Sequence, residues 1–290
     1  MKRLNVATKR GSALNGVLFD TAGADTVMIA ITGIHGNFYS NPFYYNIGDT
    51  LNDGGIDFIY AQTNDAFGRI ETVNVNTGEK ELIGSWNEDF HDTDEDIEAY
   101  LDYAKSAGYR HIVLAGHSLG ANKVIYYLSR HHDSRIDHFI LLSPAELRYL
   151  MSGVTEYEKQ IIYDQVKRGD GKKMLPFPFI GWVNCIADTA YGWWFDNFLD
   201  NVHVEPDKDF SQVAAITHTG AFVIGTYDTF TYGDPAGFLK TINDHMKTAK
   251  ENQLIYIEKT GHTYQKMEQE LADRLLSLLQ NWFPEEKKEN

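Results

Sequence analysis

The stretch that decides the fold is His111-Ile112-Val113-Leu114-Ala115-Gly116-His117-Ser118-Leu119-Gly120. Its first half is an apolar, β-branched run that predicts a buried strand, and residues 120–131 have the pattern of an amphipathic helix. Between the two lies Ser118, with glycines two residues before and after it. A Cβ atom at either glycine would collide across so tight a turn. The stretch therefore predicts a strand, a sharp turn that carries a serine, and a helix.

This arrangement is a nucleophile elbow, which holds a serine in strained backbone and exposes its hydroxyl group at the end of a sheet. The five-residue pattern alone can arise by chance in a chain with this glycine and serine content, and an ordinary strand-to-helix turn is the alternative. The context decides between the two readings. A strand of the right length ends at Gly116, and a helix begins within two residues of Ser118.

The bulk properties of the 290-residue chain narrow the class of protein. The length predicts one large α/β domain or two small ones, and without a run of about 18 apolar residues we expect no membrane span. The first six residues lack the apolar stretch of a secretory leader, and Cys185 is the only cysteine, so we expect a cytoplasmic protein. A net charge of −15 argues against nucleic acid as a partner. Nothing in the sequence predicts an oligomeric state.

Acidic residues gather at Glu88-Asp89 and at 92–98. We interpret them as the solvated start of a helix, with Asp92 or Thr93 as the N-cap and carboxylates favoured by the helix dipole. A metal site is the alternative, but the spacing Asp-x-Asp-x-Asp-Gly is missing. We therefore expect no metal site.

The remaining pattern predicts an α/β protein. Strands are expected at 5–10 and 14–20 as a hairpin around Gly11-Ser12, at 26–32, at 56–60, and at 70–75 and 79–83 as a second hairpin. Later strands are expected at 111–115, 136–142, 221–225 and 253–258, and helices within 41–53 and at 94–107, 120–131, 235–250 and 264–282. Alternation of strands and helices from residue 111 onwards implies a mostly parallel sheet. The charged tail from Pro284 is expected to fray.

A serine hydroxyl needs a base to take its proton, and that base needs a carboxylate to orient it. After a nucleophile elbow, the acid and then the base follow in chain order. Asp228 lies three residues past strand 221–225 and is our candidate acid. Asp234 is the rival, but Gly233-Asp234-Pro235 is typical of a helix N-cap followed by proline.

His262 is the candidate base. Only two histidines follow Asp228, and His245 falls within the helix expected at 235–250. His262 instead follows the last predicted strand, in a loop before the final helix. Ser118, Asp228 and His262 thus occur in the required order and at strand ends.

An oxyanion hole needs two backbone N–H groups. One belongs to Leu119, the residue after the nucleophile. The second is expected from the loop 32–38, where Asn37 is our candidate and Gly36 or Phe38 the alternatives. We interpret His35 in the same loop as a packing residue.

From His35-Gly36 through 116–120 to Asp228 and Gly261-His262, the chain resembles the α/β-hydrolase superfamily. The resemblance implies a mostly parallel eight-stranded sheet flanked by helices, and no cofactor. A serine at position 118 argues against dehalogenase or epoxide-hydrolase chemistry, whose enzymes carry aspartate there. The segments 33–37 and 116–122 are also similar to a family that includes fungal esterases of hydroxamate siderophores.

About 75 residues interrupt the alternation of strands and helices. In the superfamily such an insertion forms a helical cap, so we expect a cap at 145–220 and a core at 1–144 and 221–290. The aromatic residues of this expected cap either line the substrate-binding site or form the cap's own core. The candidate substrate contacts are Phe38, His117, Trp182, Trp193 and Trp194.

These observations predict a serine hydrolase that cleaves a carboxylic ester, and we expect its substrate to be a small molecule of medium size and partly apolar character. A thioesterase, peptidase or acyltransferase would use the same triad. A binding protein that has kept the fold without catalysis is the alternative from another class.

Overall fold

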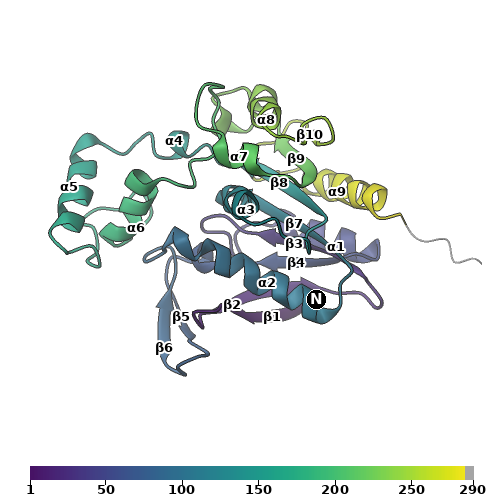
Figure 1. The fold of residues 1–290 in the computed structure, drawn as a ribbon, viewed down its shortest axis with the longest axis horizontal. Helices are drawn as coiled ribbons and strands as arrows, with labels where there is room; N and C mark the ends of the chain where they lie inside the picture. The colour runs from purple at the N-terminus through teal and green to yellow at the C-terminus, as the bar shows by residue number, and fades with distance from the viewer. Residues whose placement is uncertain (285–290) are drawn as a thin grey trace, which may run out of the picture.

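The computed structural model describes residues 1–284 and is built on one eight-stranded sheet (Figure 1). The strand order is β1-β2-β4-β3-β7-β8-β9-β10. Strand β2 runs antiparallel to both of its neighbours, and all other neighbouring strands are parallel. The prediction of a mostly parallel eight-stranded sheet is confirmed. The strands are β1 (Lys2–Ala7), β2 (Ala13–Phe19), β3 (Thr26–Ile31), β4 (Asp57–Ala61), β7 (His111–Ser118), β8 (His138–Pro144), β9 (Thr219–Gly225) and β10 (Gln253–Ile257).

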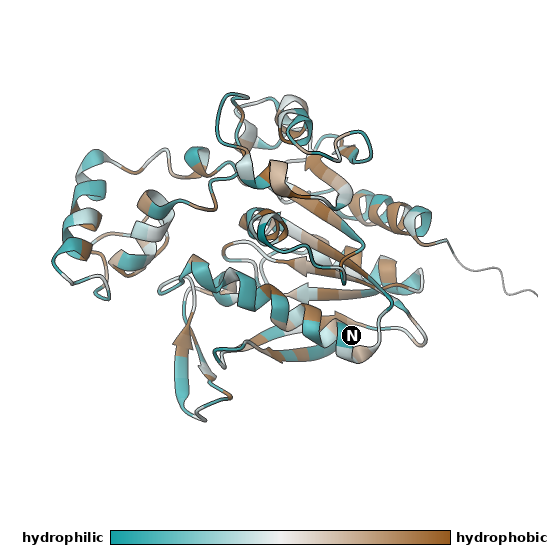
Figure 2. Cartoon of the chain, in the orientation of Figure 1, coloured by the Kyte–Doolittle hydropathy of each residue, from teal (hydrophilic) through white to brown (hydrophobic). Residues whose placement is uncertain are grey.

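Helices cover both faces of the sheet (Figure 1). Val27, Ile29 and Ile31 of β3 pack in one apolar cluster with α2, α3 and α8. Met28 and Ala30 point to the opposite face and pack with α1 and α9. Because both faces are buried, the central strands are apolar throughout, and Figure 2 shows this in their colour. The helices are α1 (Phe43–Asp53), α2 (Thr93–Ala107), α3 (Leu119–Arg130), α8 (Pro235–Asp244) and α9 (Glu268–Trp282).

Helix ends follow the predicted signals in two places and differ in two. Helix α2 ends at Gly108, whose φ of 91° is left-handed, and Asp234 caps α8 by accepting the N–H of Gly237. Helix α8 stops at Asp244, six residues before the predicted end, and α9 begins at Glu268 instead of 264. Tyr264 and Lys266 have φ values of 54° and 67°, which a right-handed helix cannot contain.

A separate two-stranded sheet, β5 (Ile70–Val73) and β6 (Lys80–Ile83), forms the second predicted hairpin. Short 3₁₀ turns occur at Asn64–Ala66, Phe90–Asp92 and Thr229–Thr231. The fraying predicted for the tail lies, from residue 285 onwards, outside the described residues. Within residues 1–284, no helix combines the length and apolar character needed to cross a membrane.

The acidic stretch is not uniformly solvated, and the prediction was wrong for two of its residues. Glu88 and Asp96 are 5% and 2% exposed. Asp96 pairs with Arg10 at 2.6 Å. Glu88 pairs with the buried amine of Lys123 at 2.5 Å, and Asp65 lies 3.1 Å from the same amine. Asp92 stands at the N-cap of α2, but its side chain makes no capping hydrogen bond.

The segment between β8 and β9 forms α4 (Leu147–Leu150), α5 (Glu156–Lys167), α6 (Ala187–Tyr191), the π-helical turn Gly192–Asp196, and α7 (Ser211–Ala215). Helices α5 and α6 stand out from the body at one end of the sheet (Figure 1). Their apolar cluster joins Phe179 and Trp193 to Leu119 of the elbow. By contrast, Val202, Val213 and Ile216 pack in the main core with α3 and α8. The projecting part is therefore shorter than the expected 145–220.

Candidate active site

Ser118 lies at the turn between β7 and α3, with φ 56° and ψ −129°. This conformation is strained for a residue with a side chain. A Cβ on Gly116 would lie 2.3 Å from the carbonyl oxygen of Gly120, and a Cβ on Gly120 would lie 2.2 Å from that of Ile31. Both glycines are therefore required by close backbone contact, and the turn has the geometry of a nucleophile elbow.

The carboxylate of Asp228 and the imidazole of His262 form a hydrogen-bonded pair. His262 Nδ1 lies 2.9 Å from Asp228 Oδ2, and the N–H of Phe230 donates to Oδ1 at 3.0 Å. Asp228 is 1% exposed, and it follows β9 as predicted. Because a carboxylate only accepts, Nδ1 carries the proton and Nε2 is left with a lone pair. Among the described residues, this buried Nε2 has no hydrogen-bond partner, so no hydrogen bond joins it to Ser118.

Several contacts keep Asp228 ionised. Burial would raise the pKa of its carboxyl group, but hydrogen bonds from His262, the Phe230 N–H and the Ser143 hydroxyl outweigh this and hold the pKa below its usual value. Ser143 Oγ also lies 2.9 Å from Tyr264 Oη, which lies 3.1 Å from the carbonyl oxygen of Val223. Sequence reasoning missed Ser143 and Tyr264, because neither belongs to a motif.

The two rejected candidates lie elsewhere. Asp234 caps α8, and His245 is at the C-terminal end of that helix, where its ring stacks on Phe210 at 3.9 Å. His245 is therefore a packing residue outside the helix interior.

His117 connects the elbow to the His262 loop. Its Nε2 lies 2.8 Å from the carbonyl oxygen of His262, and the two rings are 5.0 Å apart. Burial, aided by the neighbouring His262, lowers the pKa of His117 to about 3, so the ring is neutral and Nε2–H must be the donor. At 3% exposure, His117 lies under the His262 loop. This position differs from the substrate contact expected from the sequence and indicates that His117 positions the loop.

His117 should make folding stability depend on pH. Its folded pKa of about 3 lies below the usual 6.5, so the unfolded chain binds the proton first. The stabilisation is complete above about pH 6.5 and is lost as the pH falls from there towards 3, by about 1.4 kcal/mol per pH unit. The variant His117→Gln keeps an N–H donor but cannot titrate. Between pH 7 and 5, wild type should lose about 2 kcal/mol more unfolding free energy than this variant in urea titrations. Equal losses in the two proteins would contradict the assignment.

The expected oxyanion donor Asn37 is engaged within its own loop. Its N–H donates to the carbonyl oxygen of His35 and to Ser40 Oγ, at 3.2 and 3.0 Å. The alternatives are also engaged, since the N–H of Gly36 donates to Gly33 O and that of Phe38 to Gln62 Oε1. The geometry thus differs from the expectation for all three residues.

The start of this loop, not its end, lies against the elbow. A Cβ on Gly33 would come within 3.0 Å of Ser118 Cβ and 3.3 Å of the Leu119 nitrogen. In residues 1–284, the N–H groups of Ile34 and Leu119 have no hydrogen-bond acceptor. Sequence reasoning started from the His35-Gly36 pair and chose Asn37, which lies three residues after Ile34. The pair that approaches the serine is Thr32-Gly33.

The predicted substrate contacts are spread over different surroundings. Trp193 is 1% exposed and packs on Phe90 in the core of the α5–α6 region. Trp194 lies under the amine of Lys159, 3.9 Å from its ring centroid. Trp182 is 44% exposed and meets the ring of His35 edge-on at 5.2 Å. Trp182 therefore contacts the 32–38 loop through His35.

Phe38 and His35 mainly pack within the body of the protein. Phe38 packs on Tyr45 and borders a surface cavity of about 500 Å³ at the β1–β2 edge, which none of the predicted triad lines. His35 Nε2 lies 2.5 Å from Ser85 Oγ, in agreement with a packing role.

A mostly parallel eight-stranded sheet, with helices on both faces and a serine elbow after the central strand β7, defines an α/β-hydrolase fold. The chain belongs to the family described as "Protein of unknown function (DUF1749)", which it matches over residues 13–212. No curated protein sequence matches it.

Solved structures share the fold over almost the whole chain. The siderophore hydrolase EstB from Aspergillus fumigatus has a TM-score of 0.67 at 13% identity, with 98% of this chain and 99% of that chain covered. Est1E from Butyrivibrio proteoclasticus with ferulic acid bound has a TM-score of 0.66 at 17% identity, covering 96% and 98%. A monoacylglycerol lipase from Paleococcus ferrophilus has a TM-score of 0.63 at 14% identity, covering 92% and 98%. The resemblance to the α/β-hydrolase superfamily is confirmed at the level of the fold.

Proposed function

We propose that the protein is a serine hydrolase that cleaves a carboxylic ester through Ser118, His262 and Asp228. The observation that carries the proposal is the buried 2.9 Å pair of His262 and Asp228, which leaves His262 Nε2 unpartnered beside the elbow. An imidazole held in this tautomer can act as a general base and accept a proton at Nε2. Catalytic hydrogen bonds are often long in unliganded proteins, so a missing bond to Ser118 does not oppose the role.

The proposed reaction has two steps. Ser118 Oγ attacks the ester carbonyl carbon while His262 Nε2 takes the hydroxyl proton, and Nε2–H then returns that proton to the departing alcohol. In the second step Nε2 takes a proton from water, whose oxygen attacks the acyl carbon. The acid is released as the proton returns to Ser118 Oγ. Asp228 stays ionised and stabilises the imidazolium in both steps.

The oxyanion hole of this proposal consists of the N–H groups of Ile34 and Leu119. Both are free of other acceptors in the described chain, and Gly33 lets the loop approach the Leu119 nitrogen. Two N–H groups that converge on one point stabilise the charge that develops on the carbonyl oxygen. Ile34 replaces Asn37 as the second donor.

The variant Ile34→Pro tests this donor directly. Ile34 occupies the second position of the turn closed by the Gly36 N–H and Gly33 O, where proline is well tolerated. Proline removes the N–H group together with the Ile34 side chain, so kcat should fall by about 10²–10³-fold in a protein that remains folded. Ile34→Ala, which also shortens the side chain but keeps the N–H group, is the matched control and should keep its kcat. Full activity in folded Ile34→Pro would exclude this donor.

An ester is the proposed substrate because the structural neighbours named above include a monoacylglycerol lipase and a siderophore hydrolase, and because the fold accommodates such chemistry. We further propose that the α5–α6 region is a cap, since its apolar cluster includes Leu119 and contacts Ile34. On this proposal the body comprises 1–144 and the chain from about residue 200 onwards.

The direct test is a panel of p-nitrophenyl esters of increasing acyl length, run beside one thioester and one aminoacyl amide. We expect the highest kcat/KM for an ester of medium acyl length. A preference for the thioester or the amide would shift the assignment to those activities. A folded protein without turnover on any member of the panel would favour the binding-protein alternative.

A further inference from the structure

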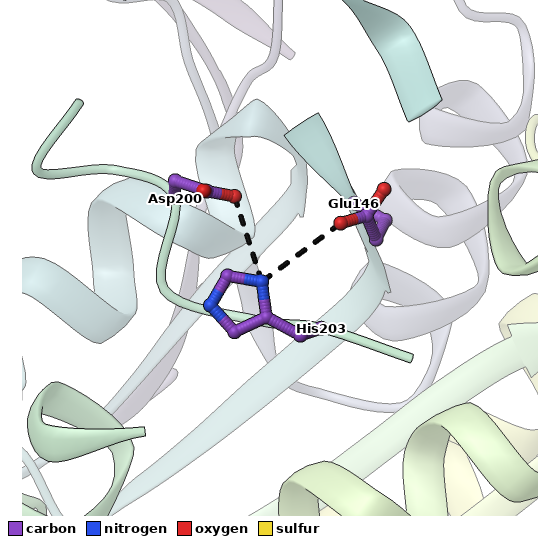
Figure 3. Close-up of side chains that lie close together, drawn as sticks. All are labelled: Glu146, Asp200 and His203. Carbon is purple, nitrogen blue, oxygen red and sulfur yellow. Dashed lines mark ion pairs between the residues drawn. The ribbon is translucent and has the colours of Figure 1, made fainter. Parts of the chain in front are cut away.

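Three buried side chains converge at the base of the projecting segment. Glu146 follows β8, whereas Asp200 and His203 lie in the loop before α7. His203 Nδ1 lies 3.8 Å from Glu146 Oε1 and 3.6 Å from Asp200 Oδ1, and all three side chains are 1% to 3% exposed (Figure 3). The three atoms lie within 4.8 Å of one another.

Each of these three atoms lacks a hydrogen-bond partner among the described residues. The second oxygen of each carboxylate is engaged, since Glu146 Oε2 accepts the Tyr149 N–H at 2.6 Å and Asp200 Oδ2 accepts Arg148 Nε at 3.0 Å. The unpartnered atoms are therefore the ones that face each other. Buried polar atoms are rarely left unsatisfied, and several that point at one centre indicate a ligand.

The charges at this centre do not balance within the protein. Among residues 1–284, two buried carboxylates meet one arginine, Arg148, whose side chain is 48% exposed. A protonated His203 would supply a second cation, but its Nδ1 stands 3.6 Å and 3.8 Å from the oxygens, longer than a hydrogen bond. A small divalent cation between the three atoms would satisfy them all.

We propose that Glu146, Asp200 and His203 bind a divalent transition-metal ion of the zinc type. A four-coordinate zinc ion with bonds of about 2.1 Å holds its ligands about 3.4 Å apart, close to the two measured separations. One imidazole nitrogen with two carboxylate oxygens is a ligand set suited to zinc, whereas Ca²⁺ and Mg²⁺ prefer oxygen alone. Water completes the fourth position. Asp200 and His203 are three positions apart, but Glu146 lies more than 50 positions before them, so no local sequence spacing predicted the set.

The ion would fasten the two ends of the projecting segment to each other. Asn122, in the first turn after the elbow, already donates to the carbonyl oxygens of Ala145 and Leu199 at 2.9 and 3.0 Å. Glu146 and Asp200 are the next residues along each chain segment. A metal bridge between them would brace the helix that begins after Ser118. This inference does not depend on the proposed function.

Zinc binding to the full-length protein tests the proposal. After treatment with a chelator and its removal, titration with ZnCl₂ in a calorimeter should show one site per chain. Zinc at 100 times its Kd should raise Tm by roughly 5 °C or more. His203→Asn should weaken binding by at least about 100-fold. The control His91→Asn removes an exposed histidine that also pairs with an aspartate, Asp89, at 2.8 Å, and it should keep the full site.

A second measurement uses the wild-type protein, so it does not depend on whether a variant folds. Co²⁺ added to the metal-free wild type should give the visible absorption of a four-coordinate ion with nitrogen and oxygen ligands, and Zn²⁺ should abolish it. If wild type binds neither ion, or if folded His203→Asn binds zinc as wild type does, the three side chains do not form a metal site and the proposal is wrong.

Discussion

Replacing Ser118 by alanine should lower kcat for ester hydrolysis by about 10⁴-fold or more, because the loss of the nucleophile removes the covalent step. The fold should survive, since alanine at a φ of 56° is no more strained than serine. The measurement is kcat on the best p-nitrophenyl ester, together with Tm. Ser106→Ala, on the exposed face of α2, is the matched control and should leave kcat unchanged. Comparable turnover by Ser118→Ala would show that another group attacks the ester.

The variant Asp228→Asn tests whether Ser118 acts as part of a triad or without the carboxylate. An amide can donate to Nδ1 and thereby favour the wrong imidazole tautomer, so kcat should fall by about 10⁴-fold with the geometry kept. Asp234→Asn, at the N-cap of α8, should change kcat little. Loss of activity in the second variant and not in the first would transfer the role to Asp234.

The second large effect concerns stability. Lys123→Met should lower the free energy of unfolding by about 3–5 kcal/mol, because it leaves Asp65 and Glu88 as buried carboxylates without a cation. The amine is 1% exposed and lies 3.1 Å and 2.5 Å from the two oxygens. Both carboxylates raise the pKa of Lys123 against the effect of burial, and burial together with Asp65 raises that of Glu88. Urea unfolding monitored by circular dichroism measures the loss.

Two control proteins sharpen this result. Lys240→Met breaks the exposed Lys240–Asp244 pair and should cost less than about 1 kcal/mol. Combining Lys123→Met with Asp65→Asn and Glu88→Gln removes the uncompensated charges, so it should recover much of the loss. A single variant as stable as wild type would show that the buried charges are compensated by other means.

Local patterns predicted most of the fold. Apolar runs of five to seven residues became the central strands because both faces of the sheet are covered, as β3 shows with residues 27, 29 and 31 on one face and 28 and 30 on the other. The elbow was predictable for a similar reason. Gly116 and Gly120 are needed for close contacts that arise within a few residues of the serine and across to β3.

Features that depend on contacts between distant segments could not be predicted. The Lys123 cluster joins residues 65, 88 and 123, and Trp193 packs on Phe90 instead of facing a substrate. Helices α8 and α9 are shorter than their amphipathic patterns, because apolar spacing continues into turns that also face the core. Sequence reasoning chose Asn37 and not Ile34 as the second oxyanion donor because a motif specifies residue types only. Which N–H group in the loop is free depends on the hydrogen bonds that the folded loop makes.

The nucleophilic serine is the central claim, and reaction with a fluorophosphonate tests it most directly. The reagent phosphonylates a serine only where a base activates it. Intact-protein mass spectrometry should show one adduct on wild type, peptide mapping should place it on Ser118, and Ser118→Ala should show none. Folded wild type that stays unlabelled, or an adduct that persists on Ser118→Ala, would contradict the account.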